Sequence, residues 1–179
     1  MKMKQLSFML ASLLLLVSCN SKKHEYDPYN ISGGKAKQEI SKNAFEIDFK
    51  QTAGKLKTIH INLGGSNSYD AIFDTGCSGV SISTIEAIDM FKQGTLRAED
   101  ERTPDSVQIA DGSVSERQVF KLREVTVVDK NGQPHTLRDV DATVEPNLGA
   151  PILIGSSVID NYAKKSYTVD LKKKIIRFE

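Results

Sequence analysis

Hydrophobic and polar residues alternate with a period of two along much of the chain after residue 43, which is the pattern of half-buried β-strands. The first clear example is Phe45, Ile47 and Phe49, which alternate with charged residues. Strands are predicted at residues 45–50, 56–63, 69–73, 80–82, 107–109, 114–120, 125–128, 136–137, 140–144, 151–155, 167–170 and 175–178. Because strands dominate, we expect an all-β domain of the closed or sandwich-like kind.

Short polar turns separate these runs. Asp111-Gly112 lies between two alternating runs, and this dipeptide is a strong hairpin signal. A second hairpin is predicted around Lys130-Asn131-Gly132. The charged stretch 97–105 shows no alternation and is predicted to be a loop, and the lysines after Leu171 are predicted to form a solvated turn.

Two short helices are predicted between the strands. Ser83 and Glu86 have the spacing of a capping box, so a helix is expected to begin after Ser83 and to end at Gly94. The residues expected to face inward are Ile85, Ile88 and Phe91. A second helix is predicted over 156–162, with Ser156 as its N-cap.

Length and composition restrict the possible functions. The 179 residues are enough for one modest domain with a buried core. A net charge of +1 argues against nucleic-acid binding, which usually needs a basic excess on one face. No HExxH motif, clustered His/Cys/Asp set or phosphate-binding glycine loop is present, so no metal and no cofactor is expected. Gly76-Cys77-Ser78-Gly79 is not a G-x-S-x-G nucleophile elbow, and no catalytic triad is visible.

Residues 1–18 are predicted to be a signal peptide. A basic start precedes an apolar run at 6–17 that is too short to span a bilayer comfortably. The end of this run, Leu16-Val17-Ser18-Cys19, resembles the lipobox of bacterial lipoproteins. The resemblance implies cleavage before Cys19 and lipidation of that residue. The alternative is an ordinary signal peptide followed by a chance cysteine.

Residues 19–43 are polar and rich in lysine, and we expect them to carry the lipid anchor and a flexible tether. The domain itself would occupy residues 44–179. The lipoprotein interpretation places it at a membrane through Cys19, exported and facing the periplasm. Asn20 does not resemble the common inner-membrane retention signal, so the outer membrane is preferred.

Cys77 would be the only free thiol if Cys19 is acylated, and no internal disulfide could then form. As a nucleophile, Cys77 would need a basic partner. His24, His60 and His135 are the only histidines, and none stands in a recognisable pairing with it. We therefore interpret Cys77 as a small buried hydrophobe.

The most informative stretch is 71–83, where an apolar strand runs into the polar turn Asp74-Thr75-Gly76. An ionised carboxylate at the end of a buried strand is costly unless it is paired or hydrogen-bonded. Gly76 lets the backbone fold closely around it, and backbone N–H groups and the hydroxyls of Thr75 and Ser78 are available to bind it. A simple Asx turn between strands is the alternative interpretation.

Three features follow one another in the chain: this motif, the hairpin at Asp111-Gly112, and the apolar run Leu153-Ile154-Gly155 before a short helix. In this order they resemble the retropepsin-like aspartic proteases, specifically the bacterial single-motif branch. The resemblance covers residues 59–178. It implies a retropepsin-like closed β-barrel with a flap hairpin over a cleft and one or two short helices.

The resemblance also implies roles for individual residues. Asp74 matches the catalytic aspartate, Thr75 the residue whose hydroxyl braces the two loops of a dimer, and Gly76 the turn glycine. Ser78 belongs to the same active-site loop. The residues that match the flap are Ile109, Ala110, Asp111, Gly112 and Ser113. The strand residues that match the support of the active-site loop are Ile154 and Gly155.

Two positions depart from the family pattern. Cys77 stands where the family commonly has Ala or Ser. The residue remains small, so the chemistry is expected to survive, although an oxidised thiol could block the cleft. Ser156 follows Gly155 where the viral enzymes carry an Arg that supports their dimer, and this puts the bracing of a dimer in doubt.

The implied chemistry needs two carboxylates, one to take a proton from water and one to hydrogen-bond the substrate carbonyl. Only one Asp-Thr-Gly motif is present, so a second copy of the chain is expected to supply the other Asp74 in a homodimer. The predicted function is an aspartic endopeptidase acting on peptide or protein substrates. The alternative is a non-catalytic lipoprotein that uses the fold as a binding or scaffold module, with Asp74 as a structural turn acid.

Overall fold

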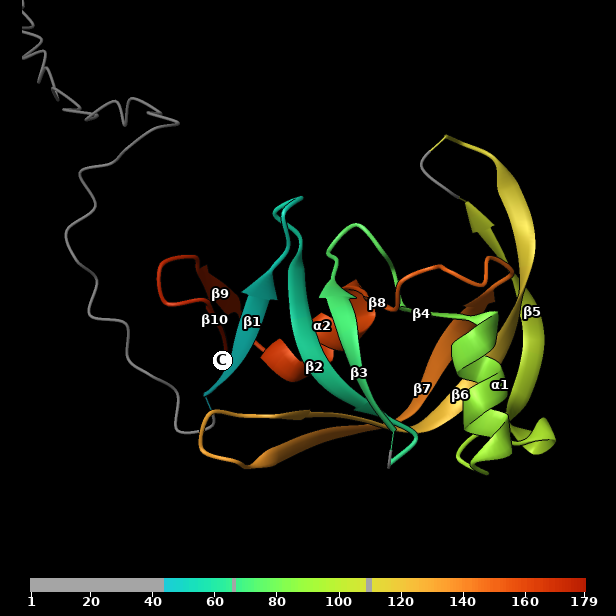
Figure 1. The fold of residues 1–179 in the computed structure, drawn as a ribbon, viewed down its shortest axis with the longest axis horizontal. Coiled ribbons are helices and arrows are strands. Elements are labelled where there is room, and N and C mark those ends of the chain that lie inside the picture. The colour runs from blue at the N-terminus through green and yellow to red at the C-terminus, as the bar shows by residue number, and fades with distance from the viewer. Residues whose placement is uncertain (1–43, 66, 109–110) are drawn as a thin grey trace, which may run out of the picture. The chain divides into compact units, whose positions relative to one another are not determined.

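A computed structural model describes residues 44–65, 67–108 and 111–179 (Figure 1). The strands are β1 (Phe45–Gln51), β2 (Lys57–Leu63), β3 (Asn67–Phe73), β4 (Val80–Ser83), β5 (Glu101–Gln108), β6 (Val114–Val128), β7 (Pro134–Glu145), β8 (Leu153–Ile154), β9 (Tyr167–Asp170) and β10 (Ile175–Phe178). The helices are α1 (Thr84–Lys92), a 3₁₀ turn (Ala98–Asp100) and α2 (Ser156–Ala163). The predicted all-β class is confirmed. The predicted signal peptide, Cys19 and the tether lie outside the described residues, as do Ile109 and Ala110.

The strands form one sheet in the order β5-β6-β7-β4-β8-β3-β2-β1-β10-β9. An additional pairing of β6 with β2, at Asn62 with Thr126 and Leu63 with Val125, closes part of this sheet into a ring. Strands β1, β10 and β9 continue beyond β2. The closure is a ring of strands rather than a regular barrel, because β4 and β8 contribute only 4 and 2 residues.

The core fills the inside of this ring and the space under both helices. Alternation along β1 and β2 correctly predicted which side chains are buried, and Ile61 and Leu63 are almost completely inaccessible. Tyr162 of α2 lies in the same core, where its hydroxyl donates a hydrogen bond to the carbonyl of Val125 at 2.6 Å. Burial raises the pKa of this phenol, so it stays a neutral donor.

The prediction of a loop over the charged stretch 97–105 is wrong for the second half of that stretch. Residues 98–100 form the 3₁₀ turn, and β5 follows from Glu101. Among the described strands, β5 is an edge strand that pairs only with β6, and nearly all its side chains are exposed. A strand that buries neither face carries no alternation of hydrophobic and polar residues, so the pattern gives no signal for it.

The predicted inward face of α1 is also wrong. Ile85, Ile88 and Phe91 are 45%, 44% and 39% exposed, whereas Ala87 and Met90 are buried. The capping box at Ser83 and the end of the helix before Gly94 are confirmed. Both stripes recur at the helical i, i+3 spacing, so only packing against the sheet distinguishes the inner from the outer face.

Other element boundaries also differ from the predictions. β6 and β7 are each continuous where shorter strands were predicted, and together they form one long hairpin. The strand predicted at 151–155 is limited to Leu153–Ile154. Gly155, not Ser156, is the N-cap of α2. Within the described residues, no helix has the length and apolarity of a bilayer-spanning segment.

Candidate active site

The Asp74 loop connects the end of β3 to β4. β3 runs parallel to β8, with Ile72 beside Leu153 and Phe73 beside Ile154. The backbone N–H of Asp74 continues this ladder by donating to the carbonyl of Ile154 at 3.0 Å. Ile154 therefore holds the backbone of Asp74 by strand pairing, and its role as active-site support stays a prediction.

The carboxylate of Asp74 is bound by its own loop. The N–H of Gly76 donates to Asp74 Oδ1 at 2.9 Å, and the N–H of Cys77 donates to the Asp74 carbonyl at 3.2 Å. One expected backbone donor to the carboxylate, the N–H of Gly76, is thus confirmed. Within the described residues, the hydroxyls of Thr75 and Ser78 make no hydrogen bond to this carboxylate, and both residues are exposed. Asp74 itself is partly exposed.

Gly155 and the start of α2 clamp the other half of the loop. The N–H groups of Gly155, Ser156 and Ser157 donate to the carbonyls of Gly79, Cys77 and Ser78 at 2.8, 2.8 and 2.9 Å. A β-carbon on Gly155 would overlap the carbonyl oxygens of Cys77 and Gly79. This close approach of two backbones is the physical reason for glycine at this position.

Ser156 does not cap α2 as predicted. Its hydroxyl instead donates to the carbonyl of Thr75 at 3.0 Å, across the loop from the helix. The loop is therefore tied to the chain on both sides of Gly76. The position that departs from the viral pattern acts here within a single chain.

Cys77 is half-buried beside the aspartate. Its thiol donates to the carbonyl of Gly79 at 3.3 Å. Burial raises the pKa of this thiol, and the negative charge of Asp74 adds to the effect. A neutral thiol is a poor nucleophile, which agrees with the interpretation of Cys77 as a small apolar residue.

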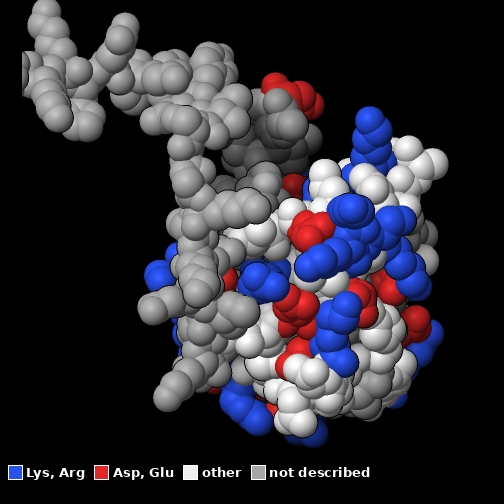
Figure 2. Space-filling view, turned by 90° about the vertical axis from the view of Figure 1, so that its left-hand side faces the viewer, with Lys and Arg blue, Asp and Glu red and all other residues white. Residues whose placement is uncertain are grey.

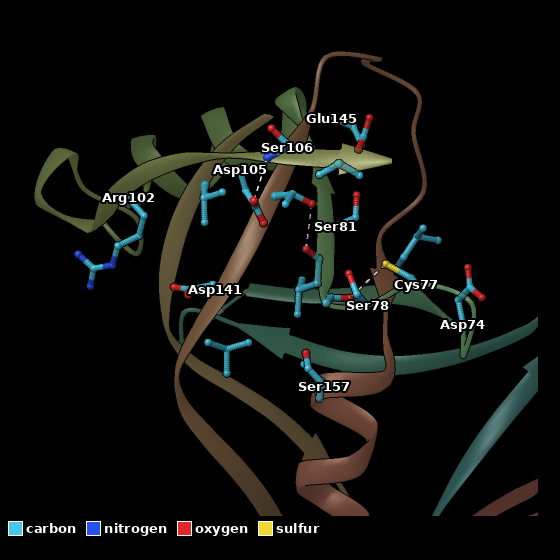
Figure 3. A pocket seen from close by; sticks show the side chains of 18 of the residues that line it. Asp74, Cys77, Ser78, Ser81, Arg102, Asp105, Ser106, Asp141, Glu145 and Ser157 are labelled. Atoms are coloured by element: carbon cyan, nitrogen blue, oxygen red, sulfur yellow. Dashed lines mark hydrogen bonds between the residues drawn. The ribbon is translucent and has the colours of Figure 1, made fainter. Parts of the chain in front are cut away.

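A cavity of about 1300 Å³ opens beside the loop. Its walls come from the Asp74 loop and β4, from β5, from β7 and from the start of α2 (Figure 3). Asp74 stands at one end of the group of lining residues, and Asp105 and Asp141 lie in the other half. This volume accommodates several residues of an extended peptide.

The hairpin of β5 and β6 is the predicted flap (Figure 1), and β5 contributes one wall of the cavity. In its turn, the N–H of Ser113 donates to Asp111 Oδ1 at 2.8 Å, and Gly112 adopts a φ of 87°. The hydrogen bonds from Ser113 lower the pKa of Asp111, so this turn acid is ionised. Residues Arg102–Gln108 of β5 line the cavity directly.

Several charged lining residues were not among the predicted site residues. They are Arg102, Asp105, Arg138, Asp139, Asp141 and Glu145. The alternation along 140–144 did predict a strand there, so its polar side was a usable signal. No group of three His, Cys, Asp or Glu residues suited to a metal ion is found in the described part of the chain.

The chain is similar to known proteins in fold and in family. The fold is similar to the crystal structure of a retropepsin-like aspartic protease from Rickettsia conorii. That match has a TM-score of 0.51 and 15% sequence identity, and covers 75% of this chain and 91% of that chain. No curated protein sequence matches the chain. The family profile described as aspartyl protease matches residues 59–158. Because this match includes the Asp74 loop, the hairpin and Gly155 and spans more than half of the chain, the chain belongs to the aspartyl protease family.

Proposed function

We propose that the protein is an aspartic endopeptidase whose active site forms between two copies of the chain. The observation that carries this proposal is the position of Asp74, which is held by its own loop at one end of the large cavity. In the described residues no other carboxylate bonds to Asp74, and the labelled acids of the cavity lie away from it (Figure 3). A symmetric dimer would bring the same residue from the second copy to the axis.

The reaction is the hydrolysis of a peptide bond. Two carboxylates held close together share one proton, because both cannot ionise readily. The ionised Asp74 takes a proton from water as the water oxygen bonds to the peptide carbon. The protonated Asp74 donates its proton to the carbonyl oxygen. Collapse of the resulting diol breaks the C–N bond, and a proton passes to the leaving amine.

The surrounding loop residues position this carboxylate. Gly76 supplies the N–H that orients Oδ1, and Gly155 allows the loop to lie against α2. The exposed hydroxyl of Thr75 makes no hydrogen bond in the described part of the chain, which leaves it free to brace the loop of the second copy. The turn at Asp111, Gly112 and Ser113 would cover the bound peptide.

Cleavage of a peptide mixture, with and without a pepstatin-type inhibitor, tests the proposal. Asp74→Asn retains an oxygen acceptor for the N–H of Gly76, so the loop should fold normally. Cleavage by Asp74→Asn should be about 10²–10⁴-fold slower than by the parent, the range typical of the loss of a general acid–base group. Equal cleavage by the two proteins would rule the mechanism out.

Mixing the two chains tests the shared site. If each active site needs one intact Asp74 from each copy, only dimers of two parent chains are active. A refolded equal mixture of parent and Asp74→Asn should then retain about a quarter of the activity of the same amount of parent. Retention of half would show that each chain works alone. A strictly monomeric protein without cleavage would favour a non-catalytic binding or scaffold module instead.

We further propose that the enzyme is an exported lipoprotein, anchored through Cys19 to a membrane and facing the periplasm, with the outer membrane preferred. The support is the lipobox-like sequence that ends at Cys19. Anchoring would raise the local concentration and favour pairing of copies. Metabolic labelling with a radioactive fatty acid should mark the parent and not Cys19→Ser. Equal labelling, or none in the parent, would contradict the anchor.

A further inference from the structure

β7 forms a wall of the cavity. Its lining residues are Leu137, Arg138, Asp139, Val140, Asp141, Thr143 and Glu145. Ala142 and Val144, between them in the sequence, point into the core. β7 therefore presents three carboxylates to the space beside the Asp74 loop.

The outer two of these carboxylates are paired. Lys121 Nζ lies 3.0 Å from Asp139 Oδ1, and Arg117 Nε lies 3.1 Å from Glu145 Oε2. Asp141 stands directly across from Lys121 in the β6–β7 register, but that lysine is paired with Asp139. Within the described residues, the carboxylate of Asp141 has no hydrogen bond or ion pair, and the residue is exposed.

The other cations of the cavity wall form no ion pair with Asp141 in the described residues. Arg138 is bound to Glu124, which lies outside the cavity, with 2.6 Å between Nη1 and Oε1. Arg102 lies on the same side of the cavity as Asp141 (Figure 3), and within the described residues it forms no ion pair. The opposite wall contributes Asp105, whose Oδ1 accepts the N–H of Ser106 at 2.8 Å. Within the described residues, Asp105 and Asp141 are therefore the two carboxylates of this half of the cavity without an ion pair.

We propose that Asp141 forms a subsite for a lysine or arginine side chain of the peptide substrate. The inference rests on the proposed function for the nature of the ligand. β4 and β7 are parallel, with Val80 beside Ala142, so Asp141 lies beside Gly79 at the end of the Asp74 loop. Asp74 and Asp141 lie in different halves of the cavity (Figure 3), so the basic residue is removed from the scissile bond rather than adjacent to it.

The subsite should select by charge. A charge-assisted hydrogen bond from an ammonium or guanidinium group is stronger than a neutral one, and a difference of about 1.4 kcal/mol corresponds to about tenfold in kcat/KM. An acidic side chain at the same position would be repelled. The selectivity should weaken with added salt, because the site is open to solvent.

Matched peptides test the subsite. Digestion of a peptide library by the full chain, read by mass spectrometry, identifies a cleaved sequence, which is then made with Lys, Gln or Glu at each position in turn. At one position away from the scissile bond, kcat/KM should be about tenfold higher for the Lys peptide than for the Gln peptide, and lowest for the Glu peptide. Asp141→Asn should remove the Lys preference, and Asp141→Lys should transfer it to Glu. Asp89→Asn, on α1 outside the cavity, is the control and should keep the parental selectivity.

A binding measurement separates this proposal from the proposed function. Fluorescent Lys and Gln peptides are titrated into Asp74→Asn, with and without Asp141→Asn, after thermal melts confirm that each variant is folded. Tighter binding of Lys that depends on Asp141, without cleavage by the parent, would support the subsite and overturn the protease. Cleavage by the parent with a Lys preference that does not depend on Asp141, or with no Lys preference, would overturn the subsite alone. Neither binding nor cleavage of any peptide would overturn both.

Discussion

Gly155 lies against the carbonyl oxygen of Cys77 so closely that no side chain can be placed between them. The same contact carries the hydrogen bonds from the start of α2 to the loop after Asp74. The active-site loop and a helix from the far end of the sequence are therefore fitted to each other at backbone level. The loop that carries Asp74 is tied to α2 by this fit.

Gly155→Ala should displace the loop and destabilise the fold. Overpacking of this kind typically costs about 1–3 kcal/mol, and here the clash is with backbone, which cannot rotate away. Urea unfolding should show the loss of stability, and peptide cleavage should fall with it. Gly149→Ala is the matched control, because its β-carbon would meet only the Asn147 side chain at 3.8 Å. Equal stability of the two variants would show that the loop has room at Gly155.

Met90 and Ile88 of α1 provide a second matched pair. Met90 is fully buried, whereas Ile88 is 44% exposed. Met90→Ala should reduce the free energy of unfolding by about 2–5 kcal/mol through lost burial and a residual cavity. Ile88→Ala should cost much less, since part of its surface is already in water. Chemical denaturation measures the loss of stability in both variants. A larger loss for Ile88→Ala than for Met90→Ala would support the helix orientation expected from sequence.

Asp129 makes the β6–β7 turn sensitive to acid. Its Oδ1 accepts the N–H groups of Gln133 and Asn131 at 2.9 and 2.8 Å, and His135 Nε2 lies 3.1 Å from its Oδ2. These interactions, with Gln133 first, lower the pKa of Asp129. A lowered folded-state pKa contributes stability that is complete above the ordinary Asp pKa of about 3.9 and is lost as pH falls through the lowered value.

Asp129→Asn should therefore be less stable than the parent at neutral pH, and the difference should shrink as the pH falls below about 4. Thermal unfolding measured over a pH series gives this difference directly. Asp160→Asn is a control, because in the described residues the exposed carboxylate of Asp160 makes no hydrogen bond or ion pair. A constant difference between parent and Asp129→Asn across the series would contradict the prediction.

The Cys77 thiol should react slowly with alkylating reagents. Its pKa is raised chiefly by burial, so the reactive thiolate forms at a higher pH than in a free cysteine. The rate of iodoacetamide labelling should begin to rise at a higher pH for Cys77 than for N-acetylcysteine. Mass spectrometry of the Cys19→Ser chain isolates this site. Faster labelling than the small thiol at neutral pH would indicate an activated cysteine instead.

Alternation and turn chemistry were sufficient to predict most strands, both hairpins and the motif loop. They failed where a neighbouring element, rather than the segment's own pattern, determines the strand or the buried face. β5 has no apolar face, and its strand conformation depends on pairing with β6. For α1, two stripes were equally compatible with the spacing, and the sheet determined that Met90 rather than Ile88 is buried.

The sequence by itself determined the period-two strands, the glycine-bearing turn at Asp74 and the family resemblance, because these depend on local spacing and residue type. Only the tertiary structure decided that Gly155 touches Cys77, that Ser156 ties the loop instead of capping a helix, and that Lys121 pairs with Asp139 and leaves Asp141 open. Each of these depends on strand register and on which of several nearby groups is within reach, and local pattern does not encode such choices.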